Sequence, residues 1–122
     1  MSSSSYLKNN LLKKVFRNID FTIAAVYISL HISDVRETGA SEVVGGSYAR
    51  QAATFDVLDG EVTNSKLLAF SSMPAVTITD WGAWDASSGG NFLWGGALAI
   101  PKVVNLGDVV QIGSGDLSIS ID

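Results

Sequence analysis

The stretch that holds all three tryptophans, residues 79–98, constrains the fold more than any other part of the sequence. Two aromatic-rich runs, Trp81–Asp85 and Phe92–Trp94, flank the segment Ala86–Asn91, which contains two consecutive glycines. Glycine adopts positive φ without a Cβ clash, which tight reversals often need, so the pattern predicts a β-hairpin. Because buried aromatic rings carry the largest apolar area per residue, we expect this hairpin to anchor the core. The core residues predicted here are Trp81, Trp84 and Trp94.

Alternating apolar and polar residues characterise the chain on either side of this hairpin. Residues 24–32 alternate in this way, which predicts a long strand with one buried face. Residues 48–57 predict another strand, and Asp59-Gly60 a turn. Residues 33–47 contain three glycines and four charges and are expected to form the longest loop. The predicted fold class is mainly β, an antiparallel sandwich or jelly-roll-like domain of about eight short strands with one N-terminal amphipathic helix.

One helix is expected, from Tyr6 to Arg17, after a mobile leader of four serines in which Ser4 or Ser5 is the N-cap. An isolated helix of this length is marginal in water, so its apolar stripe must be buried on another surface. We therefore divide the chain into a leader and docking helix, residues 1–18, and a β-sandwich or jelly-roll domain, residues 19–122. The predicted assembly residues are Leu7, Leu11, Leu12, Val15, Phe16, Lys13, Lys14 and Arg17.

Charge is distributed unevenly between these two parts. Residues 1–19 hold four basic residues and no acid, a charge of +4, and the rest holds four bases and twelve acids, a charge of −8. Such a basic arm suits an acidic patch on a neighbouring copy or on another protein. Two alternatives remain open, a solvated basic helix face and a helix that closes one end of its own sandwich. Only 16% of the residues are charged, which favours a subunit of an assembly as much as a free monomer.

The sequence offers no organised reaction centre. The lack of cysteine excludes disulfides, thiolate metal sites and a cysteine nucleophile. The single histidine, His31, cannot build a histidine-based metal cage, and we expect it to make structural hydrogen bonds. Asp80 and Asp85 flank two tryptophans, as glycosidase carboxylates can, but residues five apart on a strand point to opposite faces. We therefore predict no enzymatic activity and no cofactor or metal.

The long loop is likewise interpreted without a ligand. Asp34, Glu37 and Glu42 could hold a hard cation, but their spacing does not match an EF-hand loop, so we interpret them as solvated charge. Gly45-Gly46-Ser47 lacks a Walker lysine and is interpreted as a turn. The acidic body argues against nucleic acid as a partner. No apolar run approaches the roughly 18 residues of a membrane span, so we expect no membrane insertion.

Several segments have a distinctive amino-acid sequence and order, and together they cover nearly the whole chain. They are Tyr6-Leu7 with Leu11-Leu12, AAVYISLH (Ala24–His31), ETGASEVVGGSYARQ (Glu37–Gln51), SSMPAVTITDWGAWDASSGGNFLWGGAL (Ser71–Leu98), VNLGDVVQI (Val104–Ile112) and GDLSISID (Gly115–Asp122). In this order they resemble a family of short phage virion structural proteins that are usually labelled phage tail-fibre protein. The resemblance brings no catalytic residues with it.

The resemblance implies a virion structural protein, a surface fibre or decoration subunit made in the bacterial host cytoplasm. The expected partners are other copies of the chain, with a trimer as the oligomer considered, and other virion proteins such as capsid or tail components. Two alternatives remain open. A capsid cement protein would stabilise the major capsid shell and be present in many copies. A carbohydrate-binding module for host surface glycans would expose its tryptophans.

Overall fold

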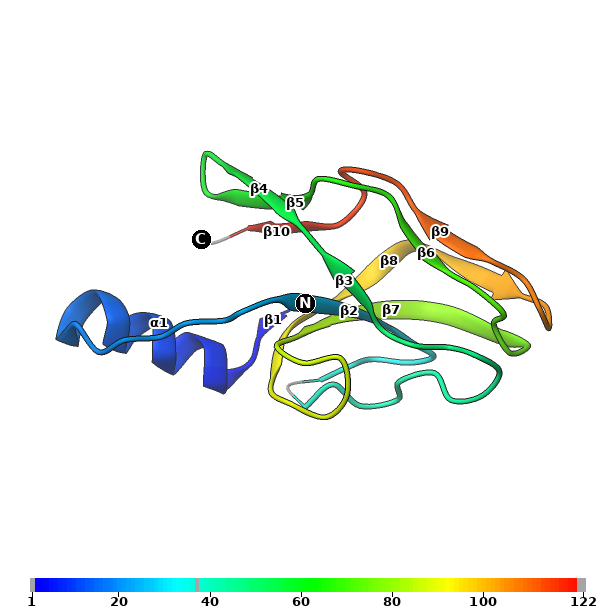
Figure 1. Cartoon of the computed structure of the whole chain (residues 1–122), viewed down its shortest axis with the longest axis horizontal. Helices are drawn as coiled ribbons and strands as arrows, with labels where there is room; N and C mark the ends of the chain where they lie inside the picture. Colours follow the sequence, from blue (N-terminus) through cyan, green and yellow to red (C-terminus); the bar gives the residue numbers. More distant parts are fainter. Residues whose placement is uncertain (1, 37, 121–122) are drawn as a thin grey trace.

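Antiparallel β-strands make up most of the chain in the computed structural model, which describes residues 2–36 and 38–120 (Figure 1). The elements in chain order are β1 (Ser2–Ser3), α1 (Ser5–Arg17), β2 (Val26–His31), β3 (Gln51–Ala53), β4 (Phe55–Leu58), β5 (Glu61–Asn64), β6 (Leu68–Phe70), β7 (Val76–Trp84), β8 (Phe92–Val104), β9 (Val110–Ile112) and β10 (Ser118–Ser120). The strands form sheets in the orders β1-β8-β7-β2-β3, β10-β5-β4 and β6-β9. The predicted fold class, mainly β and antiparallel with one N-terminal helix, is confirmed.

The main core lies on one face of the five-stranded sheet. Register places Ile28 opposite Ala83 and Leu30 opposite Trp81, so these side chains share that face. The smaller sheets supply the other side, and Figure 1 shows β6, β9 and the β4–β5 hairpin in a second layer. The buried residues of this core are Ile28, Leu30, Val43, Leu68, Phe70, Met73, Ile78, Trp81, Ala83, Val104, Val110, Ile112 and Leu117. This arrangement is sandwich-like, with apolar faces covered by facing sheets.

The predicted aromatic hairpin is confirmed as β7 and β8, with Ala83 opposite Trp94 and Trp84 opposite Phe92. Asp85 closes the turn, because its carboxylate accepts hydrogen bonds from the backbone and side-chain N–H groups of Asn91 at 2.7 and 3.0 Å. Gly82 allows close packing behind the strand, since a Cβ there would lie 2.7 Å from Ser29 Oγ. The second predicted turn is also confirmed, with Asp59 and Gly60 at φ 52° and 78° between β4 and β5.

The expectation that residues 24–32 form a strand with only one buried face was wrong. In β2, four consecutive residues, 28–31, are buried, and the strand begins only at Val26. The second face is covered because the loop 33–50 folds across it. Val35 from that loop packs with Trp84 and Phe92 as a small separate core. β2 therefore has no solvent-exposed face over residues 28–31, although an alternating pattern ordinarily indicates one.

Two further expectations need correction. The serine leader is not a free tail, since Ser2 and Ser3 pair with Gly95 and Trp94 of β8. The strand expected over residues 48–57 is split, because β3 pairs with β2 and β4 pairs with β5 in a different sheet. Thr54, between them, bonds to Ser65 through its side chain at 2.6 Å. A short extended segment that changes sheets cannot be distinguished from one continuous strand by alternation alone.

Candidate assembly surface

The helix α1 is the most solvent-exposed element of the structure, and none of its residues is buried. Local sequence fixes its ends. Ser4 is the N-cap, since its Oγ accepts a hydrogen bond from Leu7 N at 3.1 Å. Asn18 closes the other end in the left-handed region, φ 52°. Lys14 and Arg17 lie in the last turn, where cations interact favourably with the helix dipole. The predicted helix is therefore confirmed.

The base of α1 is held against the β-strands of the chain. Ser4 N donates to Leu93 O at 2.8 Å, and the helix packs against β8. The ring of Tyr6 makes an edge-to-face contact with Phe21 in the returning segment, at 5.9 Å between centroids. Beyond these contacts α1 projects from one end of the molecule (Figure 1).

Most of the predicted assembly residues are exposed to solvent on this projecting helix. The exposed fractions of Leu11, Leu12, Val15 and Phe16 are 41, 56, 72 and 78%, whereas Leu7 is half-buried. Lys14 makes a solvent-exposed ion pair with Asp20 at 3.6 Å, which contributes little to stability. Within residues 2–36 and 38–120, Lys13 and Arg17 form no ion pair. The helix thus presents an apolar stripe beside Lys13 and Arg17, which have no ion-pair partner in the described part of the chain.

The three tryptophans lie in the hairpin, on both faces of its sheet. Trp81 is 4% exposed and belongs to the main core, and Trp94 is partly buried against the same core. Trp84 is 9% exposed, on the opposite face, where the Arg50 guanidinium lies 3.8 Å from its ring centroid. Neither Trp81 nor Trp84 offers an open ring face of the kind on which a sugar stacks.

A partly buried polar network formed by side chains of the loop 33–50 was not anticipated from the sequence. Arg50 binds both carboxylate oxygens of Glu42, at 2.9 and 3.0 Å, and donates to the carbonyls of Ala86 and Gly89 in the hairpin turn. Tyr48 Oη donates to Glu42 at 2.6 Å. Burial raises the pKa of Glu42, but the hydrogen bonds from Arg50 and Tyr48 outweigh it and leave that pKa lowered. This network joins the loop to the hairpin.

His31 is fully buried in a second part of the network. Its Nε2 lies 2.6 Å from Ser29 Oγ and its Nδ1 lies 2.7 Å from the carbonyl of Ala40. Trp84 Nε1 donates to the same Ser29 Oγ at 2.8 Å. Burial lowers the pKa of His31 by penalising the charged ring. Although a serine and a histidine are adjacent, both side chains are inaccessible to a substrate, with 0% exposure. The arrangement is a set of structural hydrogen bonds.

The remaining carboxylates considered from the sequence each have a local role. Asp80 accepts from Thr79 Oγ1 at 2.7 Å, whereas Asp85 closes the hairpin turn. Asp34 accepts from Arg36 N at 3.0 Å. Glu42 is engaged by Arg50, and Glu37 lies outside the described residues. In the described part of the chain, no three His, Asp or Glu side chains converge as a metal site would require.

The Gly45–Ser47 segment is a turn, held by a hydrogen bond from Ser47 N to Ser72 O at 3.0 Å.

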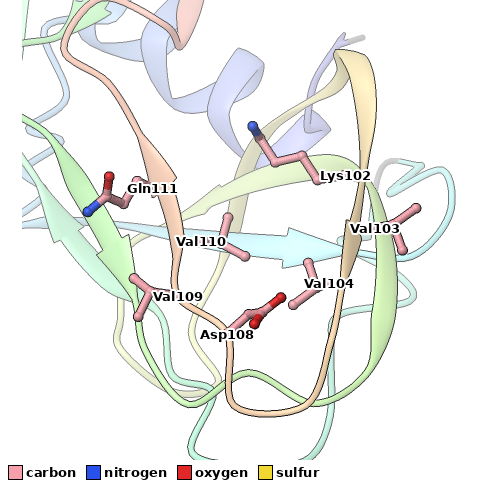
Figure 2. A pocket seen from close by; sticks show the side chains of 7 residues that line it. All are labelled: Lys102, Val103, Val104, Asp108, Val109, Val110 and Gln111. Carbon is pink, nitrogen blue, oxygen red and sulfur yellow. The ribbon is translucent and has the colours of Figure 1, made fainter.

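Two hollows lie on the described surface, and neither belongs to α1. One, of about 300 Å³, lies between the ends of β8 and β9 (Figure 2). Val104 and Val110 point into it, whereas Val103 points away, and Lys102 and Asp108 contribute one charge of each sign. The other, of about 670 Å³, lies on the β4–β5 hairpin and has an acidic lining.

No helix among the described residues is long and apolar enough to cross a membrane.

Comparison with protein families identifies the chain. Residues 2–120 match a family model described as Podophage GP4 fiber I protein gp80. The chain belongs to this family. The resemblance to phage tail-fibre proteins is therefore confirmed, and it extends over the β-domain as well as α1. No curated protein matches the chain significantly.

Proposed function

We propose that this chain is a structural subunit of a phage virion fibre, that it assembles through α1, and that it has no catalytic activity. The observation that carries the proposal is the match of residues 2–120 to the podophage fibre family. A fibre subunit acts by holding its neighbours, so its partners are other copies of the chain and other virion components. Synthesis in the host cytoplasm and incorporation into the virion follow from that role.

Assembly through α1 is favoured because an apolar helix with this exposure needs a partner. Val15 and Phe16 are 72 and 78% exposed on a helix that its own domain leaves uncovered. Burying such a side chain contributes about 1.5–3 kcal/mol, so two or three of them supply several kcal/mol to an interface. Charged residues beside the stripe keep the helix soluble before assembly and orient it on its partner.

Substitution on the helix surface tests the proposal more cleanly than truncation, because β1 before the helix is part of the main sheet. The variant Leu12→Gln/Val15→Gln/Phe16→Gln removes the three most exposed apolar side chains of the stripe without touching a buried residue. A matched control, Ile100→Gln/Val103→Gln/Leu106→Gln, removes three exposed apolar side chains from β8 and the loop that follows it, outside α1. Each chain is supplied in trans to phage that lack their own copy, and purified particles are analysed by mass spectrometry and immunogold labelling.

We expect wild type and the control to be incorporated and to label the fibres. The α1 variant should remain folded by circular dichroism and be lost from particles. If the wild-type chain is missing from purified particles, the virion role is wrong. If the α1 variant is incorporated as well as wild type, assembly depends on another surface.

A further inference from the structure

The outer face of the sheet β10-β5-β4 carries a concentrated negative charge. Register places Leu58 beside Glu61 and Asp56 beside Thr63, so these side chains share one face. The opposite face holds Phe55 and Ile119, which pack against the core, and Val57, which is 73% exposed near the end of the hairpin. The outer face is open to solvent, since Asp56, Leu58 and Glu61 are all exposed. Its hollow of about 670 Å³ is lined by Asp56, Asp59, Glu61, Leu58, Thr63 and Ser120, among others, with no basic residue.

These carboxylates are not neutralised within the chain. The ion pairs in residues 2–36 and 38–120 are Lys14–Asp20 and Arg50–Glu42, so Asp56, Asp59 and Glu61 have no cationic partner there. Glu61 accepts a hydrogen bond from Ser118 Oγ at 2.7 Å, which holds its side chain in place but leaves its charge. At the rim of the hollow Leu58 is 73% exposed. The surface is thus a concave acidic face with one large apolar side chain.

The projecting helix is complementary to this face in charge and in shape. Lys13 and Arg17 are four residues apart and therefore lie on one side of α1, next to the stripe that ends at Phe16. A convex basic helix with exposed apolar side chains matches a concave acidic sheet with an exposed leucine. Opposite charges across an interface fix its orientation and accelerate association.

We propose that α1 of one copy docks across the outer face of β10-β5-β4 of a second copy of this chain. The inference rests on the proposed role of α1 in assembly and names its partner surface. Within one chain α1 packs against β8, pinned there by Ser4 and by the Tyr6–Phe21 contact. The acidic face is therefore available to the helix of another molecule.

The positions of the two surfaces allow the contact to be reciprocal. Along the longest axis of the molecule, α1 and the β4–β5 hairpin lie in the same half (Figure 1). A two-fold arrangement that brings these ends together places each helix on the sheet of its partner, so the same contact forms twice. If each α1 instead docks on the acidic face of the next copy around a ring, the same contact forms a larger closed oligomer.

Charge reversal on the full-length chain tests this contact. One variant, Lys13→Glu/Arg17→Glu, reverses the helix, and a second, Asp56→Lys/Glu61→Lys, reverses the sheet face. A third combines all four substitutions in one chain. The matched control, Lys66→Glu/Lys102→Glu, changes net charge as the helix variant does, at exposed positions outside both surfaces. Sedimentation velocity over a concentration series gives the dissociation constant for self-association at low and at high salt.

We expect wild type to self-associate and each single-surface reversal to weaken association by about tenfold or more, because like charges would face each other. The combined variant should recover wild-type association, and the control should leave it unchanged. Salt should weaken the wild-type contact, since exposed charges are screened. Wild type that stays monomeric, a reversal without effect, or a combined variant that fails to recover would each overturn the inference. Incorporation of the chain into particles is measured separately, so a failed contact is distinguishable from a failed virion role.

Discussion

Proton positions in the buried chain around His31 follow from its partners. The carbonyl of Ala40 can only accept, so His31 Nδ1, 2.7 Å away, must carry the proton and donate it. His31 Nε2 is then an acceptor and receives a hydrogen bond from the Ser29 hydroxyl, whose oxygen accepts from Trp84 Nε1. Every donor in this chain of bonds has one acceptor, and no buried side-chain polar atom of the described residues lacks a partner. A second proton on the imidazole has no acceptor in this arrangement.

The first prediction follows from the position of Trp84. Trp84→Ala should lower the free energy of unfolding by about 3–5 kcal/mol, the range for large buried aromatic truncations. The ring that this variant removes packs against Phe92, with 5.2 Å between ring centroids, and against the Arg50 guanidinium. Its N–H donates a hydrogen bond to Ser29 Oγ. Chemical denaturation measures the loss. Trp84→Phe keeps a ring and should cost less, whereas a loss below about 1 kcal/mol for the alanine variant would mean that the ring is not a packing element.

The second prediction concerns stability against pH. Because burial lowers the pKa of folded His31 below its unfolded value of 6.5, the unfolded chain binds more protons at mildly acidic pH. The contribution of neutral His31 is fully present above pH 6.5 and is lost as pH falls below it, by up to about 1.4 kcal/mol per pH unit. Glu42 and Asp85, with lowered pKa values, lose their contributions at more acidic pH. Urea denaturation from pH 7.5 to 5.5 measures the slope.

His31→Gln supplies the control for this slope, because glutamine does not titrate. Its stability should be lower throughout but flat over the same pH range. An equal slope in wild type and in the glutamine variant would show that another group is responsible.

At the scale of elements, the loop 33–50 is held to the hairpin by one ionic cluster. The Arg50 side chain is 7% exposed and that of Glu42 is 23% exposed, so the pair is largely withdrawn from water. The Tyr48 hydroxyl joins the cluster to β2, since it accepts from Leu30 N at 3.0 Å and donates to Glu42. Burial and the hydrogen bond to Glu42 raise the pKa of Tyr48, so its hydroxyl keeps the donated proton.

The third prediction tests this cluster with a double-mutant cycle. Arg50→Met leaves the Glu42 charge without its partner and should cost about 3 kcal/mol, the lower end of the range for a broken buried pair, because Glu42 retains some contact with water. Glu42→Gln should also destabilise, and the double variant should lose less than the sum of the two. Denaturation of all four proteins gives the coupling energy. Additive losses would mean that the two side chains do not act together.

The same elements show what the sequence could and could not predict. The bounds of α1 and the aromatic hairpin were predictable because their signals, a serine cap, an apolar stripe and a turn, lie within a few residues. The burial of β2 on both faces was not predictable from the sequence, because it depends on how the loop 33–50 is held over the strand. Arg50 of that loop bonds to carbonyls 36 and 39 residues away, and no local sequence pattern encodes such contacts. The two-residue strand β1 was missed because serines carry no β signal. The acidic face of β10-β5-β4 also depends on register between distant strands.

At the scale of the whole molecule, unlike surfaces occupy opposite ends of the long axis. A basic, apolar helix projects at one end, and the turn between β8 and β9 lies toward the other (Figure 1). Val103 at the end of β8 and Leu106 in this turn are each 79% exposed. The nearly neutral hollow of Figure 2 belongs to that second end. The acidic hairpin lies in the half that carries the helix. A subunit with distinct surfaces at its two ends can make different contacts along an assembly, which suits a fibre component.

The last prediction concerns catalysis. We expect the purified chain to release no products from bacterial cell wall or capsular polysaccharide. A glycosidase needs two carboxyl groups about 5–10 Å apart on either side of one bond, in a site that a sugar can enter. The Asp80 carboxylate accepts a hydrogen bond from Thr79 on β7, and the Asp85 carboxylate accepts from Asn91 in the turn. Burial raises the pKa of Asp85, but the hydrogen bonds from Asn91 outweigh it and leave that pKa lowered. A lowered pKa is the reverse of what a general acid requires at neutral pH. Reducing-end assays and mass spectrometry of the digests measure the outcome. Reproducible cleavage that disappears in Asp80→Asn or Asp85→Asn, with the fold unchanged by circular dichroism, would contradict the structural role and make the hairpin an active site.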